Sequence, residues 1–149
     1  MKIAVASDHA GWKDKTRLIE HLAALGHDVT DFGTDSEEST DYPDYAAKAA
    51  RAVTQGKCDQ AVLVCGTGIG MSMAANKIRG IRAAACQTVD AARFSRAHNN
   101  ANVLCLGARL SSPASMREIV DTWLATNFDG GRHARRVDKI TALEENKEV

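Results

Sequence analysis

The stretch QAVLVCGTGIGMSMAANK, residues 60–77, decides the fold. Its first six residues, Gln60 to Cys65, are a short apolar run, which is typical of a buried parallel strand. Three glycines follow within five positions, and Met71 to Lys77 then predicts a short helix. A strand that passes through a glycine-rich turn into a helix is the first half of a βαβ unit.

The rest of the chain repeats this alternation on both sides. Short apolar runs predict four more strands, at residues 2–7, 27–32, 81–86 and 102–106. Helical periodicity lies between the runs; Pro43, for example, is placed to open a helix and Gly56 to end it. The charged tail from Gly131 is also predicted to be helical. We therefore predict one α/β domain over residues 1–149, a Rossmann-like, five-stranded parallel sheet with helices on both faces and a C-terminal helical tail.

Composition and charge narrow the function classes. The 149 residues carry 19 basic and 19 acidic side chains, and a net charge of zero argues against a general nucleic-acid-binding protein. No apolar run approaches the roughly 20 residues of a membrane span, and the N-terminal strand leaves no room for a signal peptide. Because the four cysteines form no C-x-x-C pair, we expect reduced thiols and no zinc ribbon. We expect a cytoplasmic protein with no nucleic-acid or membrane partner and no metal.

The fold class indicates where a ligand should bind. In a doubly wound sheet, ligands bind beyond the carboxyl ends of the strands. This rule singles out Asp8 and His9, the loop before Tyr42, the segment Cys65 to Gly70 and the residues after the fifth strand. Asp8 and His9 could bind ligand hydroxyls, although Asp8 would also serve as a helix N-cap.

The turn from Gly66 to Gly70 is the most specific feature. Its glycines let several backbone N–H groups approach one anionic oxygen at the start of a helix. It is not the dinucleotide fingerprint, whose third glycine would stand at Met71, and no Gly-Lys-Ser/Thr sequence makes a Walker A loop. We therefore predict an anion-binding turn of another kind. The alternative is a tight turn that binds nothing.

Two side chains could carry proton chemistry. Cys65 ends its strand beside a helix N-terminus, where a thiol can ionise near neutral pH and act as a nucleophile or base. The alternative is a buried structural cysteine, which we expect for Cys86 and Cys105. His98 could act as an acid–base group or simply end its helix. His21 and His27 have no partner that the sequence reveals, and we expect both at ordinary surface positions.

The C-terminal tail holds a basic cluster. Arg132 and Arg136 are four residues apart and share one face of a helix, which suits them to clamp a phosphate. Arg109, just after the fifth strand, could be a third member. The alternative is a solvated basic face. These arginines therefore indicate an anionic ligand only when they are considered together with the glycine turn.

Six blocks of the sequence resemble the type B ribose-5-phosphate isomerases. The blocks are SDHAG (7–11), TDYPDYA (40–46), CGTGIGMSMAANK (65–77), GIRAA (80–84), HNNANVLCLGAR (98–109) and GGRHARRV (130–137). They follow in order over nearly the whole chain. Because the wider family includes isomerases of allose, galactose and tetrulose phosphates, the resemblance is more specific for the family than for the substrate.

The resemblance implies an aldose–ketose isomerase of carbohydrate metabolism, in the pentose phosphate pathway, that needs no cofactor. Cys65 would move a proton between C1 and C2 of ribose 5-phosphate, His98 would open the furanose ring, and Thr67 would relay a proton. A homodimer, or a dimer of dimers, would hold the sites at its subunit interface. The implied substrate-binding residues are Asp8, His9, Tyr42, Gly66, Thr67, Gly68, Ile69, Gly70, Asn99, Arg109, Arg132 and Arg136. One branch of the family has a serine and a glutamate where this chain has Cys65 and Ile69, so the chain follows the cysteine branch.

Other functions stay open at this point. The same scaffold could isomerise allose 6-phosphate or a tetrose phosphate instead. A non-catalytic phosphosugar-binding module is a candidate of another class, but it would need neither the base Cys65 nor the acid His98. A redox sensor built on Cys65 would lack a nearby resolving cysteine in the sequence.

Overall fold

Five parallel strands form one sheet in the computed structural model, which describes residues 1–148. The strands are β1 (Lys2–Ser7), β2 (Asp28–Asp31), β3 (Gln60–Cys65), β4 (Ala83–Ala85) and β5 (Val103–Gly107). Their order in the sheet is β2-β1-β3-β5-β4, and every pair is parallel. The predicted Rossmann-like sheet is therefore confirmed.

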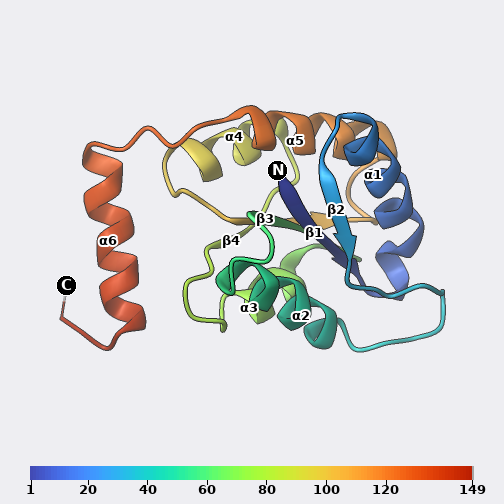
Figure 1. Cartoon of the computed structure of the whole chain (residues 1–149), viewed down its shortest axis with the longest axis horizontal. Coiled ribbons are helices and arrows are strands. Elements are labelled where there is room, and N and C mark those ends of the chain that lie inside the picture. The colour runs from blue at the N-terminus through green and yellow to red at the C-terminus, as the bar shows by residue number, and fades with distance from the viewer. Residues whose placement is uncertain (149) are drawn as a thin grey trace.

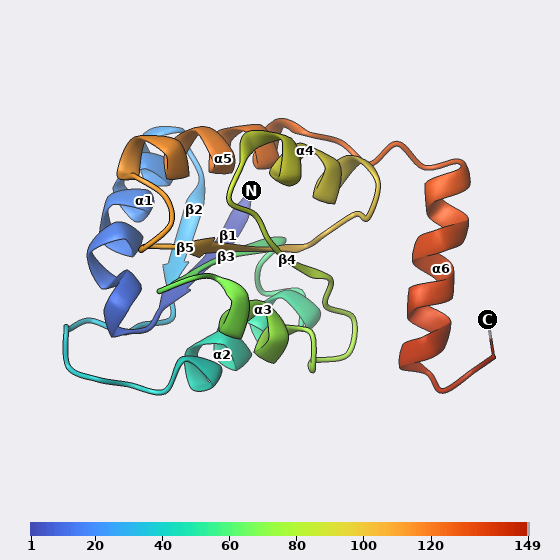
Figure 2. The ribbon, with the colours of Figure 1, turned by 180° about the vertical axis from the view of Figure 1, so that it is seen from behind.

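Helices cover both faces of the sheet (Figure 1). One layer contains α1 (Trp12–Ala24), which follows a short 3₁₀ turn at His9–Gly11, together with α4 (Val89–Ala97) and α5 (Pro113–Ala125). The other layer contains α2 (Tyr42–Thr54) and α3 (Ile69–Ala75). The predicted tail helix is α6 (Arg132–Glu144), which stands beside the layers rather than within them, as the reverse view also shows (Figure 2). Across residues 1–148, every helix is too short or too polar to cross a membrane.

The core has one layer on each face of the sheet, and the two layers differ in side-chain size. On the α1–α4–α5 side, large residues such as Leu18, Leu22 and Trp123 are fully or almost fully buried. On the other side, α2 buries alanines, including Ala46 and Ala49. Small side chains let that helix lie close to the sheet, which brings its first residues near the ends of the central strands.

The strands β2 and β5 lie within one residue of their predicted bounds, whereas β4 and α3 differ more from the sequence prediction. The strand expected over 81–86 is β4, with only three residues, because the N–H of Arg82 donates to Oδ1 of Asn102 (2.8 Å) instead of to a strand. The helix expected from Met71 begins at Ile69, directly after Gly68 in a left-handed conformation.

Candidate active site

The loop after β1 packs against the end of β3, at the point where the sheet order reverses. The chain leaves β1 for β2 on one side, while β3 pairs with β1 on the other, so this is the switch point at which doubly wound sheets bind ligands. The N–H of Asp8 donates to the carbonyl of Val64 at 3.3 Å. A Cβ on Gly11 would lie 2.5 Å from that same oxygen. Asp8 is therefore held next to the strand end that carries Cys65.

Asp8 and His9 are fixed by main-chain contacts. Oδ1 of the buried Asp8 accepts hydrogen bonds from the N–H groups of Ala10 (3.0 Å) and Gly11 (3.2 Å), so Asp8 is the N-cap of the 3₁₀ turn that leads into α1. Nδ1 of His9 accepts a hydrogen bond from the N–H of Thr40 at 3.2 Å. The neutral imidazole of His9 therefore carries its proton on Nε2. This pair can offer a ligand one acceptor, Oδ2 of Asp8, and one donor, Nε2–H of His9.

Cys65 ends β3 inside a tight backbone loop. Its sulfur accepts a hydrogen bond from the N–H of Gly68 at 3.1 Å, and the residue is buried. Gly68 has a φ of 77°, and a Cβ there would lie 3.1 Å from the backbone of Cys105. Oγ1 of Thr67 accepts the next N–H, that of Ile69, at 3.3 Å. Both the positive φ and the close packing on Cys105 require glycine at position 68. This backbone conformation directs the N–H of Gly68 at the sulfur of Cys65.

The other three cysteines lie within the core. Burial raises the pKa of the Cys58 and Cys86 thiols, and it raises the pKa of the fully buried Cys105 thiol well above its usual value. These thiols stay protonated at neutral pH, as expected of structural cysteines. All four cysteines are free, and Cys65 is the one placed at the switch point.

Side chains from two neighbouring elements lie over the glycine turn. A Cβ on Gly66 would lie 3.1 Å from the guanidinium of Arg109, which follows β5. A Cβ on Gly70 would lie 2.7 Å from the ring of Tyr42, the first residue of α2. Arg109 and Tyr42 thus meet the turn at the carboxyl edge of the sheet, where the sequence placed them.

His98 and Asn99 lie at the opposite edge. Helix α4 starts after the carboxyl end of β4 and leads to the start of β5, so its last turn returns to the amino edge of the sheet. The guanidinium of Arg82, which precedes β4, accordingly donates to the carbonyl of Asn99 at 3.2 Å. Within one chain, His98 and Cys65 therefore lie at opposite ends of the parallel strands.

The arginines of α6 join His98 at the amino edge. The N–H of Asp129 donates to the carbonyl of Ala97 (2.9 Å), which ties the segment before α6 to the end of α4. One chain therefore presents two groups of candidate residues. The carboxyl-edge group is Asp8, His9, Tyr42, Cys65 to Gly70 and Arg109, and the amino-edge group is His98, Asn99, Arg132 and Arg136.

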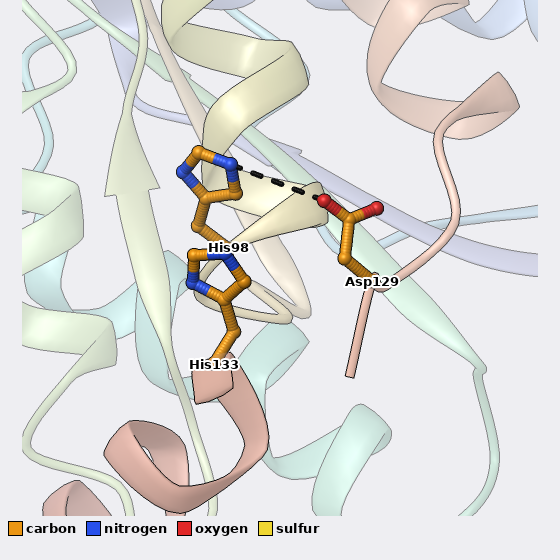
Figure 3. Close-up of side chains that lie close together, drawn as sticks. All are labelled: His98, Asp129 and His133. Atoms are coloured by element: carbon orange, nitrogen blue, oxygen red, sulfur yellow. Dashed lines mark ion pairs between the residues drawn. The ribbon is translucent and has the colours of Figure 1, made fainter. Parts of the chain in front are cut away.

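A pair of stacked histidines occupies the amino edge (Figure 3). The ring centroids of His98 and His133 are 4.2 Å apart, with 2° between the planes. A carboxylate oxygen of Asp129 lies 3.9 Å from Nε2 of His98. The three side chains offer ligand atoms within 4.8 Å of one another, but the lone pairs of parallel rings point in parallel directions and do not converge on one ion. In this arrangement the rings form a stacked pair rather than a metal site.

Comparison with known proteins places the chain in a family. The family described as Ribose/Galactose Isomerase matches residues 3–140. The chain belongs to the ribose/galactose isomerase family. The resemblance of the six sequence blocks is therefore confirmed at the level of the family.

Relatives within the ribose/galactose isomerase family match almost the full length of the chain. Ribose-5-phosphate isomerase B of Escherichia coli (strain K12) is 47% identical over 146 residues, which cover 98% of each protein. The structure of Clostridium thermocellum ribose-5-phosphate isomerase B has a TM-score of 0.97 at 50% identity and covers 98% of this chain and 99% of its own. Ribose-5-phosphate isomerase B from Mycoplasma genitalium, solved with bound ribulose-5-phosphate, has a TM-score of 0.94 at 42% identity, covering 98% and 97%.

Sequence reasoning missed two residues that contact candidate site residues of this isomerase-family chain, Gln87 and His133. Nε2 of Gln87 donates to the carbonyl of Thr67 at 2.8 Å and braces the glycine turn, but nothing in its sequence surroundings signals this role. His133 lies between Arg132 and Arg136 in the GGRHARRV block, a position that could have drawn attention to it. His21 lies at the surface, as expected, and the structure gives it a partner that the sequence did not reveal: Nε2 lies 2.7 Å from a carboxylate oxygen of Asp121, one hundred residues away in the chain.

Proposed function

We propose that the chain interconverts ribose 5-phosphate and ribulose 5-phosphate, acting as a single isomerase domain. The observation that carries the proposal is the thiol of Cys65, held at the switch point of the sheet with the N–H of Gly68 directed at its sulfur. The E. coli and C. thermocellum relatives bear the name ribose-5-phosphate isomerase B, and the M. genitalium relative was solved with ribulose-5-phosphate bound.

The proposed reaction moves one proton between two carbons. The thiolate of Cys65 removes the proton from C2 of the open-chain aldose, and the electron pair forms the C1–C2 double bond of an enediolate. The negative charge then rests on O1, where backbone N–H groups of residues 66–70 stabilise it. Thr67 relays a proton from O2 to O1, and Cys65 returns its proton to C1. The product is the ketose, with no gain or loss of atoms or electrons and no redox cofactor.

Ring opening precedes this transfer, because ribose 5-phosphate is mostly a furanose. In the proposal, His98 donates a proton to the ring oxygen while the C1–O4 bond breaks, and the anomeric hydroxyl loses its proton to give the aldehyde. Asp8, His9, Tyr42 and Asn99 bind the sugar. Arg109, Arg132 and Arg136 bind the phosphate, in keeping with the bidentate geometry of guanidinium groups.

A second copy of the chain would complete each site. Cys65 and His98 lie at opposite edges of one sheet, so a homodimer that sets the carboxyl edge of one copy against the amino edge of the other would bring them together. A C₂ dimer forms two such sites. A groove of about 440 Å³ between α6 and β4, lined by Ile81, Ala84 and Ile140 among others, offers apolar surface for such a contact. A dimer of dimers would leave these sites unchanged.

Carbohydrate metabolism in the cytoplasm, in the pentose phosphate pathway, is the setting proposed for this activity. The chain pairs a phosphosugar reaction with four free thiols and a formal net charge of zero. Free thiols are typical of a reducing compartment.

The first experiment follows ribulose 5-phosphate formation from ribose 5-phosphate without added metal. We expect turnover by the native chain and a loss of at least about a hundredfold in Cys65→Ala, the usual scale for removal of a general base. Cys58→Ala is the matched control, since it removes a buried thiol at the other end of β3. Turnover that survives in Cys65→Ala would reject Cys65 as the base.

The same assay separates the alternatives. Faster turnover of allose 6-phosphate or a tetrose phosphate than of ribose 5-phosphate would move the substrate assignment within the family. Tight binding of these sugar phosphates without turnover of any would favour a non-catalytic binding module.

A further inference from the structure

The imidazole of His98, which is 37% exposed, contacts three side chains that have no place in the reaction described above. The ring of Phe94, one turn earlier in α4, lies 4.9 Å from it at an angle of 34°. The ring of His133, in the first turn of α6, is stacked with that of His98, with 2° between their planes (Figure 3). Asp129 approaches the edge of the ring at Nε2. Together these contacts set both the plane of the His98 ring and its rotation.

A backbone hydrogen bond holds Asp129 in position. Its N–H donates to the carbonyl of Ala97, the residue before His98, at 2.9 Å. The carboxylate lies 3.9 Å from Nε2 of His98, too far for a hydrogen bond but close enough to attract a proton on that nitrogen. Since the Asp129 side chain is 58% exposed, solvent weakens this attraction and its effect is mainly on orientation.

His133 is suited to lie against a charged ring because it resists protonation. Burial lowers the pKa of His133, and the charges of His98, Arg132 and Arg136 lower it further, against the opposing effect of Asp129. At neutral pH the imidazole ring of His133 is therefore uncharged. A proton on His98 then meets no second cation across the 4.2 Å stack.

The geometry points to His133 and Asp129 as positioning residues for His98, an inference that rests on the proposed function. His133 fixes the ring plane of His98 by stacking, and Asp129, which lies beside Nε2, limits rotation of the ring within that plane. A general acid must deliver its proton along the bond that breaks, so free rotation of the imidazole would slow ring opening without disturbing the enediolate step.

The two directions of the reaction separate these steps. Ribulose 5-phosphate cannot close to a furanose, because its carbonyl is at C2 and its O5 carries the phosphate. Consumption of the ketose therefore starts from an open chain and does not depend on ring opening. Consumption of ribose 5-phosphate does depend on ring opening, because that substrate is mostly a furanose. A positioning role for His98 predicts unequal losses in the two directions, whereas a role in phosphate binding or in folding predicts equal ones.

Three variants and one control make the test. Asp129→Asn removes the charge at an exposed position and keeps the backbone N–H. His133→Ala removes the stacked ring, and His133→Phe replaces it with a ring that cannot titrate. Asp138→Asn, at an exposed position of α6, is the control for the loss of one negative charge.

For turnover of ribose 5-phosphate, we expect kcat to fall about tenfold or more in Asp129→Asn and His133→Ala, part of the usual contribution of a general acid. We expect His133→Phe and Asp138→Asn to remain within about threefold of the native chain. Consumption of ribulose 5-phosphate should stay within about threefold in all four variants. Equal losses in both directions, or a higher KM with unchanged kcat, would make these residues phosphate ligands or structural supports and overturn the inference.

An NMR titration of the histidine rings tests the inference even if neither pentose phosphate turns over, an outcome that would reject the proposed function. In the native chain, the pKa of His133 should lie below its ordinary value of 6.5. In His133→Ala the signals of His98 should shift, because the stacked ring no longer shields them. A pKa of His133 at or above 6.5, or unchanged His98 signals in His133→Ala, would also overturn the inference.

Discussion

The ammonium group of Lys15 lies 2.6 Å from a carboxylate oxygen of Asp31, although the lysine side chain is only 2% exposed. The same group donates to the carbonyl of Thr34 at 2.6 Å. Lys15 thus joins α1 to the end of β2 and to the loop that leads toward Thr40 and His9.

Substitution of either partner should destabilise the fold, but to different extents. Lys15→Met removes the charge and leaves one carbonyl without its donor, a cost of about 1–3 kcal/mol. Asp31→Asn leaves a buried ammonium group without its counter-charge. Breaking a fully buried pair in this way costs about 3–5 kcal/mol, and the 44% exposure of Asp31 reduces that figure. Urea denaturation should find both variants less stable, with Asp31→Asn the worse; the reverse order would show that the pair contributes through packing alone.

Gly70→Ala should separate activity from stability. An added Cβ would lie 2.7 Å from the ring of Tyr42, which is 40% exposed and free to move away. Because alanine favours a helix over glycine by about 1 kcal/mol, the melting temperature should hold or rise while kcat/KM falls. Tyr42→Ala, which removes the ring, should lower kcat/KM as well. Full activity in Gly70→Ala would mean that the position of Tyr42 does not matter to turnover.

Gly68→Ala should cost more than the backbone conformation alone explains. Gly56 provides the comparison, since its φ is 70° but no atom lies within 4 Å of its added Cβ. Gly56→Ala should therefore report the left-handed conformation alone, a cost of about 1 kcal/mol. Gly68→Ala adds contacts of 3.1 Å with the backbone of Cys105 and disturbs the N–H that faces Cys65. Equal losses of stability in denaturant would argue against this tight packing of the turn on β5.

The stability of the native chain should fall in mild acid, partly because of His133. Its pKa is lowered in the folded state from 6.5, so the unfolded chain takes up this proton more readily. The contribution of His133 is thus fully present above about pH 6.5 and is lost as the pH falls through the lower folded-state pKa. Between pH 7 and 5, His133→Phe should lose less stability than the native chain. His27→Asn serves as the control, and an equal slope for His133→Phe and the native chain would contradict the prediction.

Mixing two inactive variants should restore activity if two copies share each site. Cys65→Ala lacks the base and His98→Ala lacks the acid, but a mixed dimer has one site that contains neither change. After complete exchange of subunits, half of the dimers are mixed, so about a quarter of the native activity should return. Size-exclusion chromatography would follow the exchange, and no recovery after exchange would place both residues in a site within one chain.

The sequence revealed the site residues more readily than their arrangement. The glycine turn and Cys65 were predictable because a strand, a turn and a helix are local features with strong signals. The short β4 was not, because it depends on Asn102, which follows Arg82 by twenty residues. The same limit applies to His98. The rule that ligands bind at carboxyl ends does not apply to a residue at the end of a helix, so only the fold could place it across the sheet from Cys65.

The opposite placement of Cys65 and His98 also has a consequence for the living cell. Under the proposed function, a newly made chain is inert toward sugar phosphates until it meets another copy. At low expression, the total isomerase activity would then rise more steeply than the concentration of the protein. A low concentration alone would keep the enzyme inactive, without any inhibitor.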